Sequence, residues 1–193
     1  MISEIPLTKG RCFPKACAFV DDIVSGLALS TKKRLRETER HWQKLGVNVW
    51  STLWTGARGG AAMASACLIQ LAETQRPFWP WKPAGRGLLV EAFPAAQLRY
   101  WKLPHQKYIG KAEGARSKRQ QIRGFLSKLI QMDATKSQTM DDSADALDAV
   151  LCAFAAFAVT TGKAFTSPAL LPLAEGRIAV HDSLGADAEY TVS

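Results

Sequence analysis

The chain has 193 residues, of which 47% are hydrophobic and 22% are charged, and its formal net charge is +8. These values are ordinary for a globular protein, and the length is enough to bury the core of one domain. No apolar run is long and clean enough to cross a bilayer, and the first residues lack the apolar core of a signal peptide, so we expect a soluble protein of the cytoplasm. The spacing of the four cysteines does not match a zinc finger and fits reduced thiols.

The N-terminal part predicts an irregular segment and then a strand. Residues 1–15 contain two prolines and a glycine and show no hydrophobic period. Residues 16–24, ACAFVDDIV, are typical of a short buried strand that ends in Asp21 and Asp22.

Two helices are expected next. Residues 31–46 predict a charged helix whose end is marked by Gly46, since glycine suits the left-handed conformation that follows many helices. Residues 61–74 are apolar and predict a helix packed inside the protein. The proline-rich segment 77–85 predicts a loop, whose tryptophans either stack on nucleic-acid bases or pack on the surface of the domain itself.

The clearest strand is RGLLVEAF at residues 86–93, which Pro94 ends. Glu91 stands at the tip of its apolar run. This carboxylate either pairs with Arg99 or another basic residue, or shares a metal ion with other acidic residues.

A basic helix is predicted from residue 115 to residue 132, after a segment in which aromatic residues interleave with lysines. Residues 97–136 contain ten lysines and arginines against two acidic residues, whereas residues 137–193 contain two basic residues against eight acidic ones. A basic middle followed by an acidic cluster is typical of a protein that holds a polyanion close to metal-binding carboxylates. For any single basic residue, a position on a solvated helix face is the alternative.

Residues 141–163, DDSADALDAVLCAFAAFAVTTGK, predict a helix buried nearly all round. Its first turns carry Asp142, Asp145 and Asp148 at three-residue spacing, so neighbouring carboxylates repel. With Asp141 or Asp142 as the N-cap, capping and the helix dipole explain Asp142 and extend at most to Asp145. They explain Asp148 poorly because the dipole effect fades within the first turn, and a metal-binding or catalytic role for Asp145 and Asp148 is the alternative.

Residues 176–181 predict a last short strand. Because strands alternate with helices, the sequence predicts an α/β domain at 16–182, preceded by the irregular segment 1–15 and followed by a loose tail at 183–193.

Several short motifs in this order resemble a predicted nuclease family with an RNase H-like fold, the domain-of-unknown-function family 429. They are RETE at 36–39, VEAFPAA at 90–96, the later arginine-rich helix, DALDAV at 145–150 and EGRI at 175–178. The resemblance runs from about residue 21 to residue 180. The start of the DALDAV helix is also similar to that of Holliday-junction resolvases.

The resemblance implies an RNase H-like mixed sheet flanked by helices, with acidic side chains meeting from strand ends and one helix. It gives catalytic and metal-binding roles to Asp22 (or its neighbour Asp21), Glu91, Asp145 and Asp148. Carboxylate oxygens suit Mg²⁺ or Mn²⁺, and two such ions can activate water and stabilise the leaving oxygen of a phosphodiester. We expect DNA or RNA to contact seven basic residues: Arg36, Lys107, Lys111, Arg116, Lys118, Arg119 and Arg123.

The start of the chain departs from this fold, which begins with a strand that bears the first catalytic aspartate. Before residue 16 the only acidic residue is Glu4. A truncated gene or wrong start, a remnant that no longer cleaves, and missing strands supplied by a partner are the open explanations. We expect a second copy or a partner chain to cover the open sheet edge. The sequence therefore predicts a metal-dependent nuclease, with a non-catalytic nucleic-acid-binding remnant or a truncated fragment as the alternative.

Overall fold

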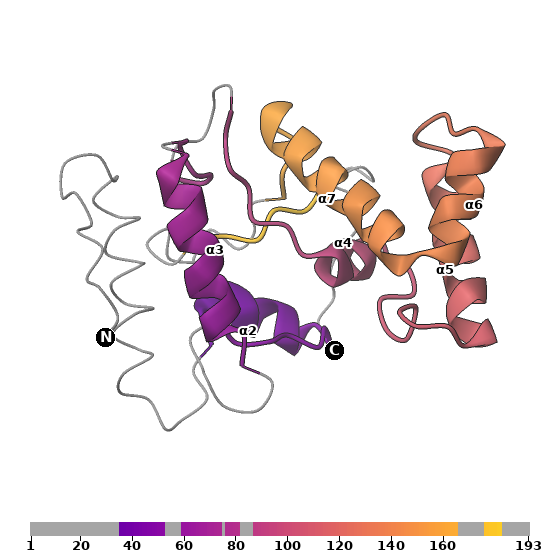
Figure 1. Ribbon diagram of the computed structural model, residues 1–193, viewed down its shortest axis with the longest axis horizontal. Coiled ribbons are helices and arrows are strands. Elements are labelled where there is room, and N and C mark those ends of the chain that lie inside the picture. Colours follow the sequence, from indigo (N-terminus) through magenta and orange to yellow (C-terminus); the bar gives the residue numbers. More distant parts are fainter. Residues whose placement is uncertain (1–34, 53–58, 75, 82–86, 166–175, 183–193) are drawn as a thin grey trace.

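The computed structural model describes residues 35–52, 59–74, 76–81, 87–165 and 176–182. Its helices are α2 (Glu37–Lys44), α3 (Ala61–Glu73), α4 (Pro94–Tyr100), α5 (Glu113–Leu126), α6 (Ala134–Asp142) and α7 (Ala144–Thr160). In Figure 1, α5 and α6 lie at one end of the described part, α2 and α3 lie toward the other end, and α4 and α7 lie between them. The predicted strand 16–24, with Asp21 and Asp22, and the predicted tail lie outside the described residues.

The prediction of an RNase H-like mixed sheet is wrong for the described part of the chain, which contains helices and isolated bridges but no strand. The two predicted strands that are described, around Glu91 and Ala179, do run beside each other, and the Ala179 N–H donates to the Glu91 carbonyl at 2.8 Å. Pairing stops there because each segment changes its neighbour after two or three residues. The bridges of these segments join Phe78 to Leu89, Ala92 to Ala179, and Ala164 to His181.

The aspartate-rich stretch forms two helices instead of one. Between α6 and α7 stands Ser143, whose hydroxyl accepts a hydrogen bond from the Ala146 N–H at 3.2 Å. A serine N-cap satisfies one of the free N–H groups at a helix start, so the expected capping by Asp141 or Asp142 is wrong. The two helices meet at a bend of 112°. Among the described residues, only this bent pair, and no single helix, has the length and apolar character that a membrane span requires.

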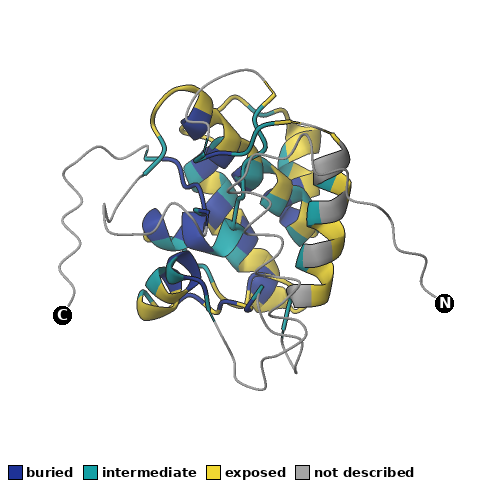
Figure 2. Ribbon diagram, turned by 90° about the vertical axis from the view of Figure 1, so that its left-hand side faces the viewer, coloured by how far each residue is buried: buried dark blue, intermediate teal, exposed yellow. Residues whose placement is uncertain are grey.

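The core gathers around one side of α7, which buries Leu147 and Leu151 against Ile122 and Leu126 of α5 and against Leu98 of α4. Figure 2 shows buried stretches toward the middle of the described part and exposed stretches on its outer helix surfaces. The expectation that this helix is buried all round is wrong, because its other side includes a half-exposed phenylalanine, Phe157. Likewise α3 was expected inside, yet Met63 on it is 76% exposed. A run of apolar residues predicted a helix in each case but did not predict how much of its surface is covered.

The end of α2 follows the predicted pattern. Gly46 has a φ of 83°, and the N–H groups of Gly46 and Val47 donate to the carbonyls of Gln43 and Trp42. This pair of hydrogen bonds is the Schellman motif, which ends a helix with a glycine in the left-handed region. The chain then turns toward Thr52, which matters for the ion network described next.

Candidate functional site

Arg36 joins two glutamates in a buried ion network. Its Nε lies 3.0 Å from Oε1 of Glu39, and its two terminal nitrogens donate to the two carboxylate oxygens of Glu91. Burial works against the charged guanidinium, but the Glu91 and Glu39 carboxylates hold the pKa of Arg36 above its usual value. The Thr52 hydroxyl also donates to Glu39 at 2.6 Å. Arg36 is 2% exposed and donates to both glutamates, so it is not placed to contact a nucleic acid.

The first two aspartates of the acidic stretch also have arginine partners. Asp141 accepts from Arg123 Nε at 2.7 Å, and Asp142 accepts from Arg116 Nε at 3.0 Å. The Gln138 amide and then the Arg116 charge lower the pKa of Asp142. These contacts tie α5 to α6. The two arginines were predicted to contact nucleic acid, and in the structure both form ion pairs with carboxylates of the same chain.

Asp148 and Asp145 differ from these neighbours. Asp148 is half-buried, and its Oδ1 accepts a hydrogen bond from the Tyr108 hydroxyl at 2.8 Å. Neither aspartate forms an ion pair within the described residues. Burial raises the pKa of Asp148, the Tyr108 hydrogen bond partly offsets this, and the nearby charge of Asp145 raises it further. Burial and the Asp148 charge also raise the pKa of Cys152, one turn along α7.

The four carboxylates predicted to share metal ions are not gathered in the described residues. Glu91 is bound by Arg36, Asp22 lies outside the described ranges, and no three acidic, histidine or cysteine side chains in those ranges are placed to hold a metal. Asp145 and Asp148 remain as a pair. Magnesium is commonly held by one or two carboxylates, with water and substrate phosphate oxygens completing its shell. The pair therefore fits a Mg²⁺ or Mn²⁺ site that the substrate completes.

The loop that links α4 to α5 lies beside this pair, because Tyr108 belongs to it (Figure 1). Alternate carbonyls of the loop are held by two consecutive side chains of α5. Lys118 Nζ donates to the Gln106 carbonyl at 3.1 Å, and Arg119 Nη1 donates to those of Tyr108 and Gly110 at 2.7 and 3.0 Å. Arg119 is 3% exposed. Both residues were predicted to contact nucleic acid, and the structure places them in contacts that fix the loop.

We call residues 102–111 the basic loop. Lys102, Lys107 and Lys111 are exposed on it, and Ile109, between the last two lysines, is 66% exposed. The backbone at Lys102 and Lys107 is left-handed, with φ of 58° and 57°. Such a conformation costs a residue other than glycine about 1–3 kcal/mol and persists where the surroundings impose it. The loop is thus a fixed, positively charged surface next to the carboxylate of Asp148.

Sequence reasoning missed the role of Tyr108, which is 3% exposed and ties the basic loop to α7. Its pKa is raised by burial and by the Asp148 charge, so the hydroxyl keeps its proton and remains a donor at neutral pH. No local pattern could have revealed this contact, since the two residues are 40 positions apart in the sequence. The interleaving of lysines with Tyr108 and Ile109 was the one local signal in this segment, and it gave no indication of the contact with Asp148.

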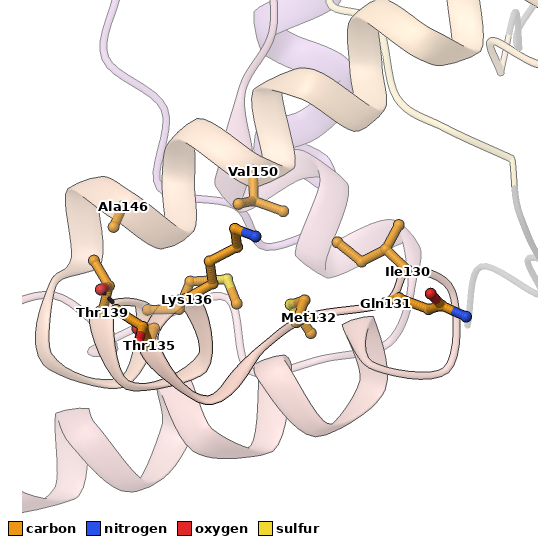
Figure 3. Close-up of a pocket in the computed structure, with 9 residues that line it drawn as sticks. Ile130, Gln131, Met132, Thr135, Lys136, Thr139, Ala146 and Val150 are labelled. Atoms are coloured by element: carbon orange, nitrogen blue, oxygen red, sulfur yellow. Dashed lines mark hydrogen bonds between the residues drawn. The ribbon is translucent and has the colours of Figure 1, made fainter.

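A separate cavity of about 280 Å³ lies where the segment between α5 and α6 faces α6 itself and the start of α7 (Figure 3). Its lining is mostly apolar and includes the side chains of two methionines, and no residue predicted for the site takes part. The lining residues are Ile130, Gln131, Met132, Thr135, Lys136, Thr139, Met140, Ala146 and Val150. With no carboxylate in it, this cavity is unsuited to a metal-bound phosphodiester.

Comparison with known proteins gives one match. The model of a family described as a protein of unknown function, DUF429, matches residues 11–170. No curated protein matches the chain, and no solved structure does. The matched range contains the Arg36 network, the basic loop and the carboxylates of α6 and α7.

Proposed function

The chain belongs to the DUF429 family, whose model covers most of its length, and we propose that it is a divalent-metal-dependent phosphodiesterase acting on DNA or RNA. The observation that carries the proposal is the pair Asp145 and Asp148. It has no cationic partner among the described residues, and it lies beside the basic loop. Two neighbouring carboxylates without a counter-charge repel each other, and a divalent cation removes that repulsion.

Asp145 and Asp148 would hold Mg²⁺ or Mn²⁺. When bound, such an ion supplies a Lewis acid for a phosphate oxygen and lowers the pKa of a water molecule. Tyr108 orients the Asp148 carboxylate by donating to its Oδ1, and its raised pKa keeps that donor in place at neutral pH. Lys107 and Lys111, both exposed on the basic loop, would neutralise the phosphates of a substrate that approaches from the loop side.

Non-catalytic binding of nucleic acid is the second candidate. It is favoured by the state of Glu91, whose carboxylate is bound by Arg36 and does not join the α7 pair within the described residues. A chain with this arrangement would hold a nucleic acid through its lysines, with no hydrolysis. Cleavage assays separate the two candidates.

The test uses the purified full chain with Mg²⁺ or Mn²⁺ and with branched, single-stranded, duplex and DNA–RNA hybrid substrates. Asp148→Asn is the variant, and Asp142→Asn is the control, because Asp142 lies in the same acidic stretch but pairs with Arg116. We expect Asp148→Asn to lower cleavage more than about 100-fold, since loss of an outer-shell partner alone typically costs 10–100-fold. The control should keep its activity. Equal cleavage by wild type and Asp148→Asn would identify a contaminant, and salt-dependent binding with no cleavage would establish the second candidate.

A further inference from the structure

We propose that the basic loop binds a single strand of nucleic acid, with Lys107 and Lys111 on phosphates and Ile109 against an unstacked base. The inference takes nucleic acid as the partner from the proposed function and deepens it by naming the substrate class. Three features of the loop support it: its rigidity, the order of its exposed side chains and its position.

The loop is held in one conformation before any ligand arrives. Lys118 and Arg119 donate hydrogen bonds to three loop carbonyls, those of Gln106, Tyr108 and Gly110. The Tyr108 hydroxyl donates a further hydrogen bond to Asp148. Ligand binding to a fixed surface loses less conformational entropy than binding to a surface that must first become ordered. The left-handed backbone at Lys107 is part of the same fixed conformation.

The exposed side chains alternate with the anchored carbonyls. Lys107, Ile109 and Lys111 are exposed, and an isoleucine that is 66% exposed stands between two lysines. Phosphate contacts alone would explain the lysines but not the isoleucine. Apolar side chains, isoleucine among them, pack against base faces in proteins that unstack nucleic acid, and binders of single strands combine a basic track with stacking surfaces.

A single strand fits this surface better than a duplex does. In a duplex the base faces are stacked and are not available to Ile109 unless the helix is first kinked, which costs free energy. A single strand already presents base faces alongside its phosphates. The surface also adjoins the candidate site, because Tyr108, the residue between Lys107 and Ile109, donates to the Asp148 carboxylate.

The test measures binding with no divalent metal, in EDTA, by fluorescence anisotropy of a labelled single strand and of the duplex with the same sequence. The variants of the full chain are Ile109→Ala and the double variant Lys107→Gly/Lys111→Ala, in which glycine also relieves the left-handed backbone. The control is Lys128→Ala. Lys128 is exposed beyond the far end of α5, roughly 20 Å from the start of that helix at 1.5 Å per residue. Thermal melts verify that each variant is folded.

We expect the wild type to bind the single strand more tightly than the duplex. Ile109→Ala should weaken single-strand binding about 5-fold, since covering the exposed part of an isoleucine side chain is worth on the order of 1 kcal/mol, and should leave duplex binding unchanged. The double variant should reduce the slope of log K against log salt by about 1.4, or about 0.7 for each lost phosphate contact. Lys128→Ala should stay within about 2-fold of the wild type, as a residue outside the contact surface does.

Three results overturn the inference: no binding of nucleic acid, an Ile109→Ala variant that binds the single strand as the wild type does, or an equal loss for both substrates. Its failure can be told apart from failure of the proposed function, because the binding assay contains no metal. If the chain binds the single strand as described but cleaves nothing in Mg²⁺ or Mn²⁺, the proposed phosphodiesterase activity is refuted and single-strand binding by the basic loop stands. If the chain cleaves nucleic acid but Ile109→Ala binds the single strand as the wild type does, the phosphodiesterase stands and single-strand binding through Ile109 is refuted.

Discussion

Replacement of Arg36 by methionine tests whether the Arg36 network belongs to the fold. Methionine keeps the length of the side chain and removes its charge. The Arg36 side chain is 3% exposed, and it bonds to Glu39, which is 1% exposed, and to Glu91, which is 38% exposed. Without the guanidinium, the Glu39 carboxylate stays buried and keeps only the N–H of residue 36 and the donors of Thr52.

Removal of one partner from a buried ion pair costs about 3–5 kcal/mol, mainly because the remaining charge has lost its compensation. The part that comes from Glu91 is small, since that side chain reaches solvent. For a chain of this length, each kcal/mol lowers Tm by about 2–4 °C, so we expect a drop of roughly 6–20 °C. Addition of Glu39→Gln should recover part of this loss because the uncompensated buried charge is then gone.

The assay is thermal unfolding followed by circular dichroism, with urea unfolding as a second measure. Arg40→Met is the matched control, one turn into the helix that Arg36 precedes. Arg40 pairs with Glu37 at 2.9 Å, but the two side chains are 48% and 42% exposed, and such a surface pair contributes less than about 1 kcal/mol. If Arg36→Met lowers Tm no more than Arg40→Met does, the network does not stabilise the fold and the reasoning fails.

Three further predictions concern Asp148, its partner Tyr108, and the N-cap of α7, Ser143. The folded-state pKa of Asp148 is raised, so its contribution to stability is full at low pH and is lost as pH rises through that pKa. In EDTA, the Tm of Asp148→Asn should therefore be higher than that of the wild type at pH 7 and equal to it near pH 3. A lower Tm for Asp148→Asn at pH 7 would contradict this reasoning. Tyr108→Phe should raise the pKa of Asp148 further, as measured by NMR titration, and should weaken Mg²⁺ binding about 10-fold in calorimetry. Ser143→Ala removes the N-cap of α7 and should cost about 1 kcal/mol in urea unfolding, whereas Ser117→Ala, at an exposed position within α5, should cost almost nothing.

Local patterns in the sequence predicted most helices but not how extended segments pair. The apolar residues placed α3 within one residue and the start of α5 within two, although the end of α5 was predicted six residues too late, and Gly46 marked the end of α2. The apolar runs around Glu91 and Ala179 identified segments that do run beside each other. Which extended segments pair depends on contacts between distant parts of the chain, and the periodicity of hydrophobic residues does not predict those contacts. The break at Ser143 was missed because two aspartates just before it are equally good N-caps.

The candidate site was predicted in part, for the same reason. The reasoning that a buried carboxylate needs a partner selected Glu91, Asp145 and Asp148. It could not tell which carboxylates an arginine already compensates, because Arg36 reaches Glu91 across 55 positions of sequence. It also treated each arginine and lysine of α5 as a surface charge, although Arg119 is buried.

The bend between α6 and α7 explains why four aspartates in one short stretch have different surroundings. Asp141 and Asp142 end α6, which packs along α5, so they meet Arg123 and Arg116. The serine cap then turns the chain by 112°, and the aspartates of α7 form no ion pair with α5. Had one straight helix continued through residue 143, all four carboxylates would have followed the same axis beside the arginines. A single N-cap thus separates carboxylates that hold two helices together from a pair that forms no ion pair within the described residues.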